Sequence, residues 1–165
     1  MTSPTTKYWP ALLEAAYCAP RSNDDAETPR RSNSPEHLMN RKKILLVVDD
    51  SPTAILWHRL LLEDEGYEVL TAADGAEGVE VAKARLPELV LLDVVMPRMN
   101  GFDACRALRD DDRTREIPIL MITTRSEMQH VMKGFESGCN EYLTKPVDRT
   151  ELLTKVRSYL DRPGV

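Results

Sequence analysis

The sequence is poor in cysteine and lacks any long hydrophobic run. Its three cysteines, Cys18, Cys105 and Cys139, lie far apart and form no CxxC pair, so neither a disulfide framework nor a zinc site is indicated. No apolar stretch approaches the ~20 residues that span a bilayer. The first 20 residues hold one lysine and no long apolar core, which predicts no signal peptide. These absences favour a reducing, cytoplasmic location without a membrane span.

Positive charge is scarce relative to negative charge. The chain has 22 Lys and Arg residues against 27 Asp and Glu residues, which gives a formal net charge of -5. This acidic balance argues against direct nucleic-acid binding, which calls for a basic face. A length of 165 residues with 42% hydrophobic residues suits one globular domain.

Residues 1–40 differ in composition from the rest of the chain. They hold five of the eleven prolines, and the stretch RSNDDAETPRRSNSPEH is almost wholly polar. Such a stretch cannot bury enough apolar area to offset the entropy lost on ordering. We expect a disordered extension over 1–40 and a domain over 41–162. Residues 8–17 could instead form a short docking helix, and Met39 is an alternative start for the functional chain.

From residue 42 onward, apolar runs alternate with helical patterns. Strands are expected over 44–48, 67–71, 89–92, 117–122 and 141–143, and helices over 51–65, 74–85, 101–109, 126–137 and 148–160. Short links between alternating strands and helices predict a parallel sheet covered by helices on both faces. The expected fold is a doubly wound α/β domain with five parallel strands.

Polar residues follow the apolar runs in a way that suggests one site. Asp49 and Asp50 follow the first run, Asp93 the third, Thr123 the fourth and Lys145 the fifth. The active cleft of an open parallel sheet lies beyond the carboxyl ends of its strands, so these side chains should converge there. Each residue alone has a simpler explanation; Asp50, for example, could cap the helix that begins near residue 52.

Three clustered carboxylates repel one another unless a cation lies among them. Mg²⁺ suits such a site because it prefers a few carboxylates, water and phosphate oxygens. An aspartate carboxylate is also a competent nucleophile for forming an aspartyl phosphate. Lys145 can contact phosphate oxygens as a compact positive charge.

Residues 41–160 resemble the receiver domain of two-component response regulators. The likeness rests on VVDDSPT, LLDVVMPRMNG, MITT and YLTKPVD, in that order and spacing. It implies a flavodoxin-like sheet with strand order 2-1-3-4-5 and Asp93 as the phosphoacceptor. It also implies a Mg²⁺ site formed by Asp49, Asp50, Asp93 and the backbone carbonyl of Val95. By the same resemblance Thr123 is a switch hydroxyl, Tyr142 a switch aromatic and Lys145 the lysine that contacts phosphate.

The resemblance also implies how such a protein works. It would take a phosphoryl group from a histidine kinase and signal by a phosphorylation-dependent contact with a downstream target protein. Mg²⁺-dependent self-phosphorylation and dephosphorylation would be its only chemistry. The finer likeness is to single-domain regulators of twitching motility and chemotaxis-like pathways. The chain ends five residues after Leu160, so we expect no appended output domain.

Three other functions fit the sequence less well. An Asp-nucleophile phosphatase typically needs a second acid two residues after the nucleophile, where this chain has Val95. A flavodoxin-like nucleotide binder needs a phosphate loop after the first strand, where DDSPTA is acidic. A phosphorylation-independent receiver would not need all of the site residues that this chain carries.

Two further expectations concern the carboxyl-terminal half. The Lys145–Pro146 peptide bond is expected to be cis, on the strength of the family resemblance. The output face is expected on the helix over 126–137, the strand over 141–143 and the helix over 148–160. That face draws on an apolar set in which exposed and core residues cannot be separated from sequence: Met128, Val131, Met132, Phe135, Tyr142 and Val147.

Overall fold

The computed structural model describes residues 41–124 and 128–161. The extension expected over 1–40, its short helix and the alternative start at Met39 lie outside these ranges. The strands are β1 (Ile44–Val48), β2 (Glu68–Ala72), β3 (Leu89–Leu92), β4 (Ile119–Thr123) and β5 (Glu141–Thr144). The helices are α2 (Pro52–Asp64), α3 (Gly75–Arg85), α4 (Gly101–Arg109), α5 (Met128–Glu136) and α6 (Arg149–Leu160).

All five strands form one parallel sheet in the order β2-β1-β3-β4-β5. This confirms the predicted doubly wound, flavodoxin-like α/β fold. The chain runs from β1 outward to β2 and then crosses to β3 on the other side of β1. The carboxyl ends of β1 and β3 therefore flank the point where the strand order reverses, which is where such sheets bind ligands.

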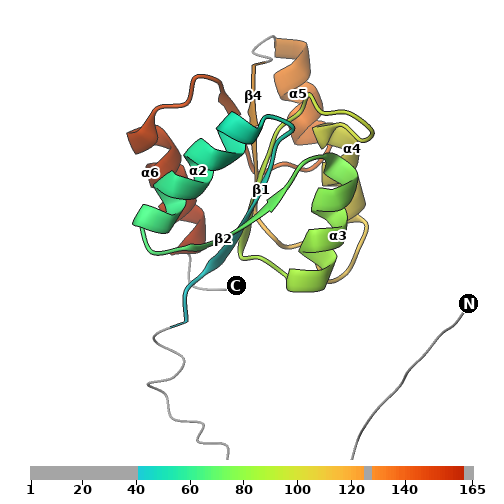
Figure 1. Cartoon of the computed structure of the whole chain (residues 1–165). Helices are drawn as coiled ribbons and strands as arrows, with labels where there is room; N and C mark the ends of the chain where they lie inside the picture. Colours follow the sequence, from blue (N-terminus) through green and yellow to red (C-terminus); the bar gives the residue numbers. More distant parts are fainter. Residues whose placement is uncertain (1–40, 125–127, 162–165) are drawn as a thin grey trace, which may run out of the picture. The chain divides into compact units, whose positions relative to one another are not determined.

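Helices cover both faces of the sheet (Figure 1). Helices α2 and α6 lie on one face, and α3, α4 and α5 lie on the other. The central strands are apolar on both sides because each face has its own core. Leu45 and Val47 of β1 belong to the core beneath α2 and α6, while Leu46 and Val48 belong to the core beneath α3 and α4.

Four helices begin with a residue whose side chain accepts a hydrogen bond from the first turn: Ser51, Asp74, Asn100 and Asp148. Such caps satisfy backbone N–H groups that have no partner within the helix. Each of these residues is also the last residue of a loop at the carboxyl edge of the sheet. The cap therefore fixes where that loop ends and its helix begins. Asp74 caps α3, the helix expected to begin near this residue.

The predicted bounds differ from the structure mainly at β4, expected over 117–122. The strand begins at Ile119, and Thr123 is its last residue rather than the residue beyond it. Pro118 has no backbone N–H, although its carbonyl accepts the N–H of Val90 at 2.9 Å. The predicted start of α5 at residue 126 lies outside the described ranges. Among the described residues, no helix has the length and apolarity to cross a membrane.

Candidate functional site

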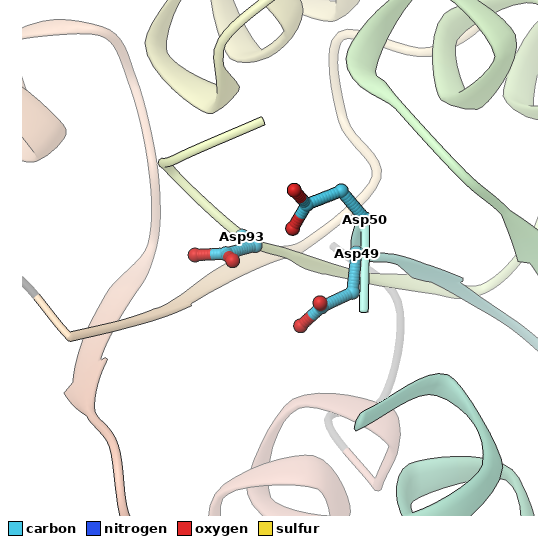
Figure 2. A group of neighbouring side chains, drawn as sticks. All are labelled: Asp49, Asp50 and Asp93. Atoms are coloured by element: carbon cyan, nitrogen blue, oxygen red, sulfur yellow. The ribbon is translucent and has the colours of Figure 1, made fainter. Parts of the chain in front are cut away.

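Three carboxylates meet where β1 and β3 end. Asp49 and Asp50 follow β1, Asp93 follows β3, and these two strands are neighbours in the sheet. One oxygen from each carboxylate lies within 4.8 Å of the others, and Figure 2 shows the three side chains grouped at the strand ends. Asp49 and Asp93 are buried and Asp50 is exposed. The predicted convergence of these residues is confirmed, and the cluster opens to solvent beside Asp50.

The carboxylate of Asp93 is held from two directions. Its Oδ1 accepts the backbone N–H of Val94 at 2.7 Å and that of Val95 at 3.4 Å. Its Oδ2 accepts the Lys145 ammonium at 3.1 Å. The side chain is therefore fixed at the base of the cluster, with a positive charge on one side.

Lys145 joins the cluster from the loop after β5. Its Nζ lies 2.6 Å from Asp49 Oδ2 and 3.1 Å from Asp93 Oδ2. Burial alone would lower the pKa of this ammonium, but the hydrogen bonds and charges of Asp49 and Asp93 outweigh burial and raise the pKa. Lys145 is therefore a permanent cation at neutral pH. The Lys145–Pro146 bond is cis, as predicted.

Asp50 does not cap a helix, so the simpler explanation for this residue is wrong. Ser51 is the N-cap of α2, and its Oγ accepts the N–H of Ala54 at 3.4 Å. Asp49 contributes to the same turn because its Oδ1 accepts the N–H of Ser51 at 2.9 Å. Asp50 is thus left at the mouth of the cluster with its carboxylate directed toward Asp93 (Figure 2).

The other predicted residues lie around the cluster. Val95 is in the loop after β3, with 46% of its surface exposed. Thr123 is buried at the end of β4, and its carbonyl accepts the Lys145 N–H at 2.8 Å. Tyr142 is half-buried on β5, where it pairs in register with Met121 of β4. A Cβ built on Gly134 would lie 2.8 Å from the Tyr142 ring, so this ring packs directly against α5.

His58 lies close enough to the site for the charges of Asp49, Lys145 and Asp93 to act on it. It is buried on α2, and its Nδ1 lies 2.8 Å from the Ala54 carbonyl. Desolvation lowers its pKa, although the Ala54 carbonyl and the charges of Asp49 and Asp93 act to raise it. The other site residues were predicted because each follows an apolar strand. His58 lies within a helix, so that pattern does not predict it.

The donor set fits a hard divalent cation. The cluster holds three carboxylates, and the Lys145 ammonium pairs with two of them, Asp49 and Asp93, which leaves two formal negative charges. All of the available side-chain donors are oxygens, and an exposed carboxylate gives an open approach. These are properties of a Mg²⁺ site that keeps several water ligands.

Fold and site together define the class of protein: a receiver with an acidic pocket at the switch point of a 2-1-3-4-5 sheet. The sequence profile of the response regulator receiver domain matches residues 45–157. The chain belongs to this family of two-component signalling domains. Receiver domains bind Mg²⁺ at an acidic pocket, and Asp49, Asp50 and Asp93 form an acidic cluster in this chain.

Three relatives show how far the likeness extends. Protein PilH of Pseudomonas aeruginosa is 41% identical over 116 residues, covering 70% of this chain and 96% of PilH. The DNA-binding dual master transcriptional regulator RpaA of Synechocystis sp. is 42% identical over 118 residues, 72% of this chain, but the match spans only 49% of RpaA. The structure of the chemotaxis protein CheY4 of Vibrio cholerae aligns with a TM-score of 0.69 and 34% identity, over 73% of this chain and 100% of CheY4. The likeness to single-domain twitching and chemotaxis regulators is confirmed.

Proposed function

We propose that this chain is a response regulator that accepts a phosphoryl group on Asp93 from a histidine kinase. One observation carries the proposal: the Asp93 carboxylate lies beside two further carboxylates and 3.1 Å from the Lys145 ammonium. A buried aspartate with this surrounding charge suits phosphoryl transfer, in which catalysis depends on positioning and charge stabilisation.

In the proposed transfer, Asp93 is the nucleophile. A carboxylate oxygen of Asp93 attacks phosphorus, and the bond from phosphorus to the donor's nitrogen breaks, with its electron pair leaving on the donor. Lys145 offsets charge on the transferred oxygens. Asp49, Asp50, Asp93 and the Val95 carbonyl would hold Mg²⁺, which would offset the negative charge of the phosphoryl oxygens. The Thr123 hydroxyl would then donate a hydrogen bond to a phosphoryl oxygen.

We further propose that the signal leaves by protein–protein contact on the face formed by α5, β5 and α6. Helix α5 exposes three large apolar side chains, Met128, Met132 and Phe135, at 73%, 56% and 50% of their surface. Methionine adapts its shape readily at contact surfaces. The chemotaxis protein CheY4, whose structure aligns over 100% of its length, supports a receiver that acts in motility or chemotaxis-like control.

Acetyl phosphate provides the direct test. With Mg²⁺ present, mass spectrometry should show the mass gain of one phosphoryl group, and chelation of the metal should prevent it. The variant Asp93→Asn should show no gain, because an amide is not a nucleophile for this reaction. The control is Asp103→Asn, which alters an exposed aspartate on α4 and should label normally. Undiminished labelling of Asp93→Asn would contradict the assignment.

We also propose that residues 41–162 form the complete receiver unit. Both cores are built from residues between Leu45 and Leu160. A chain restricted to 41–162 should therefore unfold at the same temperature as the full chain and label equally well with acetyl phosphate. A lower unfolding temperature would show that residues 1–40 contribute to the fold.

A further inference from the structure

Asp74, at the start of α3, uses its two carboxylate oxygens for different purposes. Its Oδ1 accepts the N–H groups of Ala76 at 2.8 Å and Glu77 at 3.0 Å, and so caps the helix. Its Oδ2 is paired with the guanidinium of Arg98. Asp74 is fully buried, and Oδ2 makes no hydrogen bond within the described part of the chain. The ion pair with Arg98 is therefore what compensates this buried oxygen.

Arg98 reaches Asp74 from the loop that joins β3 to α4. Its backbone φ is +63°, a left-handed conformation that costs conformational energy for any residue with a Cβ. A glycine would adopt this conformation without that cost. The ion pair gives a reason for an arginine at this position, since its long cationic side chain reaches the buried carboxylate of Asp74.

The loop between β3 and α4 also packs closely against backbone atoms on both sides. A Cβ on Gly75 would lie 2.5 Å from the Met99 carbonyl oxygen, so the start of α3 rests directly on the loop. A Cβ on Gly101 would lie 2.2 Å from the Asp93 carbonyl oxygen. The Gly101 N–H also donates to the Val94 carbonyl at 3.0 Å, which closes the loop on itself.

We propose that Asp74 and Arg98 are positioning residues that fix the loop over 94–100 and so hold the Val95 carbonyl toward the acidic cluster. The inference rests on the proposed function, in which that carbonyl is a ligand of Mg²⁺. Arg98 lies three residues beyond Val95, and its anchor, Asp74, belongs to a different segment of the chain. Loss of the pair frees this loop, and the cation site loses the orientation of one ligand.

Three variants distinguish the positioning role of the ion pair from the capping of α3 by Asp74 and from the left-handed backbone at Arg98. Arg98→Ala removes the guanidinium, whereas Asp74→Asn keeps an oxygen that can cap α3 and removes the charge. Arg98→Gly also relieves the left-handed backbone. The matched control is Arg85→Ala, at the far end of α3, where an exposed pair joins Arg85 to Glu68 at 3.1 Å.

Calorimetric titration of the full chain with Mg²⁺ measures the dissociation constant. We expect it to rise about tenfold in Arg98→Ala, Arg98→Gly and Asp74→Asn, the lower end of what loss of an outer partner costs a metal site. Arg85→Ala should bind as the parent does. At saturating Mg²⁺ the labelling rate with acetyl phosphate should recover, because the pair acts through metal affinity rather than on the phosphoryl group.

Amide exchange without any metal gives an independent readout. The Gly101 amide should exchange faster in the three variants than in the parent and in Arg85→Ala. Unchanged Mg²⁺ affinity in Arg98→Ala and Asp74→Asn, or an equal change in the control, would overturn the inference while leaving the proposed function intact. If the parent protein neither binds Mg²⁺ nor labels, the proposed function fails, and metal-free exchange at Gly101 still decides whether the pair holds the loop.

Discussion

At the scale of single residues, Lys145 shows how charge balance governs this site. Its pKa is raised because the carboxylates of Asp49 and Asp93 outweigh the cost of burial. A raised pKa means that the folded state favours the charged form. The resulting stabilisation is complete below the unfolded value near 10.5 and is lost as pH rises through the folded value. The contribution is therefore constant across the physiological range.

Replacing Lys145 by alanine should leave three carboxylates without their ammonium. Without divalent cations we expect Lys145→Ala to lower the free energy of unfolding by about 2 kcal/mol, less than the ~3–5 kcal/mol for breaking a fully buried pair. The smaller figure reflects the lysine side chain being 22% exposed. Mg²⁺ should reduce the difference in the free energy of unfolding between Lys145→Ala and the parent, since it supplies the missing positive charge. Denaturant unfolding with and without Mg²⁺ measures this, with Lys155→Ala as a surface control.

His58 should make stability depend on pH near neutrality. Its pKa is lowered by desolvation, so the unfolded chain takes up a proton more readily than the folded one. Stability should therefore fall as pH drops below the unfolded value near 6.5 and level off below the folded pKa. Thermal unfolding of the parent and of His58→Leu across this window tests the point. The variant should show a flatter profile; parallel profiles would contradict the expectation.

At the scale of elements, periodicity and strand ends were enough to predict the strands, the helices and most of the acidic cluster. Asp49, Asp50, Asp93 and Lys145 were located because each follows an apolar strand, and parallel strands end at one edge. The pairing of Asp74 with Arg98 could not be foreseen in the same way. It depends on the conformation of two loops that are distant in sequence, which no local pattern encodes.

Helix α5 contacts Tyr142, the predicted switch aromatic, at Gly134. A Cβ on Gly134 would lie 2.8 Å and 3.0 Å from Cδ2 and Cε2 of the Tyr142 ring. Alanine would stabilise an isolated helix by about 1 kcal/mol over glycine, but here it must displace the ring or the helix. We therefore expect Gly134→Ala to give no gain in stability and to shift the Tyr142 ring signals in NMR spectra.

The companion variant Tyr142→Ala isolates that contact. In its background, Gly134→Ala should recover most of the ~1 kcal/mol helix gain, because the ring is no longer present. An equal effect of Gly134→Ala in both backgrounds would show that the ring does not restrain α5. Chemical denaturation of the four proteins completes the cycle.

At the scale of the whole molecule, the proposed phosphorylation of Asp93 would have to change a surface that lies apart from this residue. Thr123 and Lys145 are joined by the hydrogen bond from the Lys145 N–H to the Thr123 carbonyl. They therefore link the ends of β4 and β5 beside the acidic cluster. Tyr142 lies on β5 against α5, whose outer side exposes Met128, Met132 and Phe135. These contacts run without a break from the acidic cluster to the outer side of α5. They favour a signalling surface on α5 and β5 over one on α2.

Beryllofluoride, a mimic of the phosphoryl group, tests the direction of that signal. A shift from 1:99 to 99:1 between two states needs about 5.5 kcal/mol. A few charge-assisted hydrogen bonds at about 1.5–3 kcal/mol each can supply it. With Mg²⁺ and beryllofluoride we expect changes in amide exchange to concentrate in the segment from Met128 to Asp148. The Asp93→Asn variant should show none of them. Changes confined to α2 and α3 would mean that the output face has been misplaced, because the mimic would then act through the helices beside β1 and β2 rather than through β4, β5 and α5.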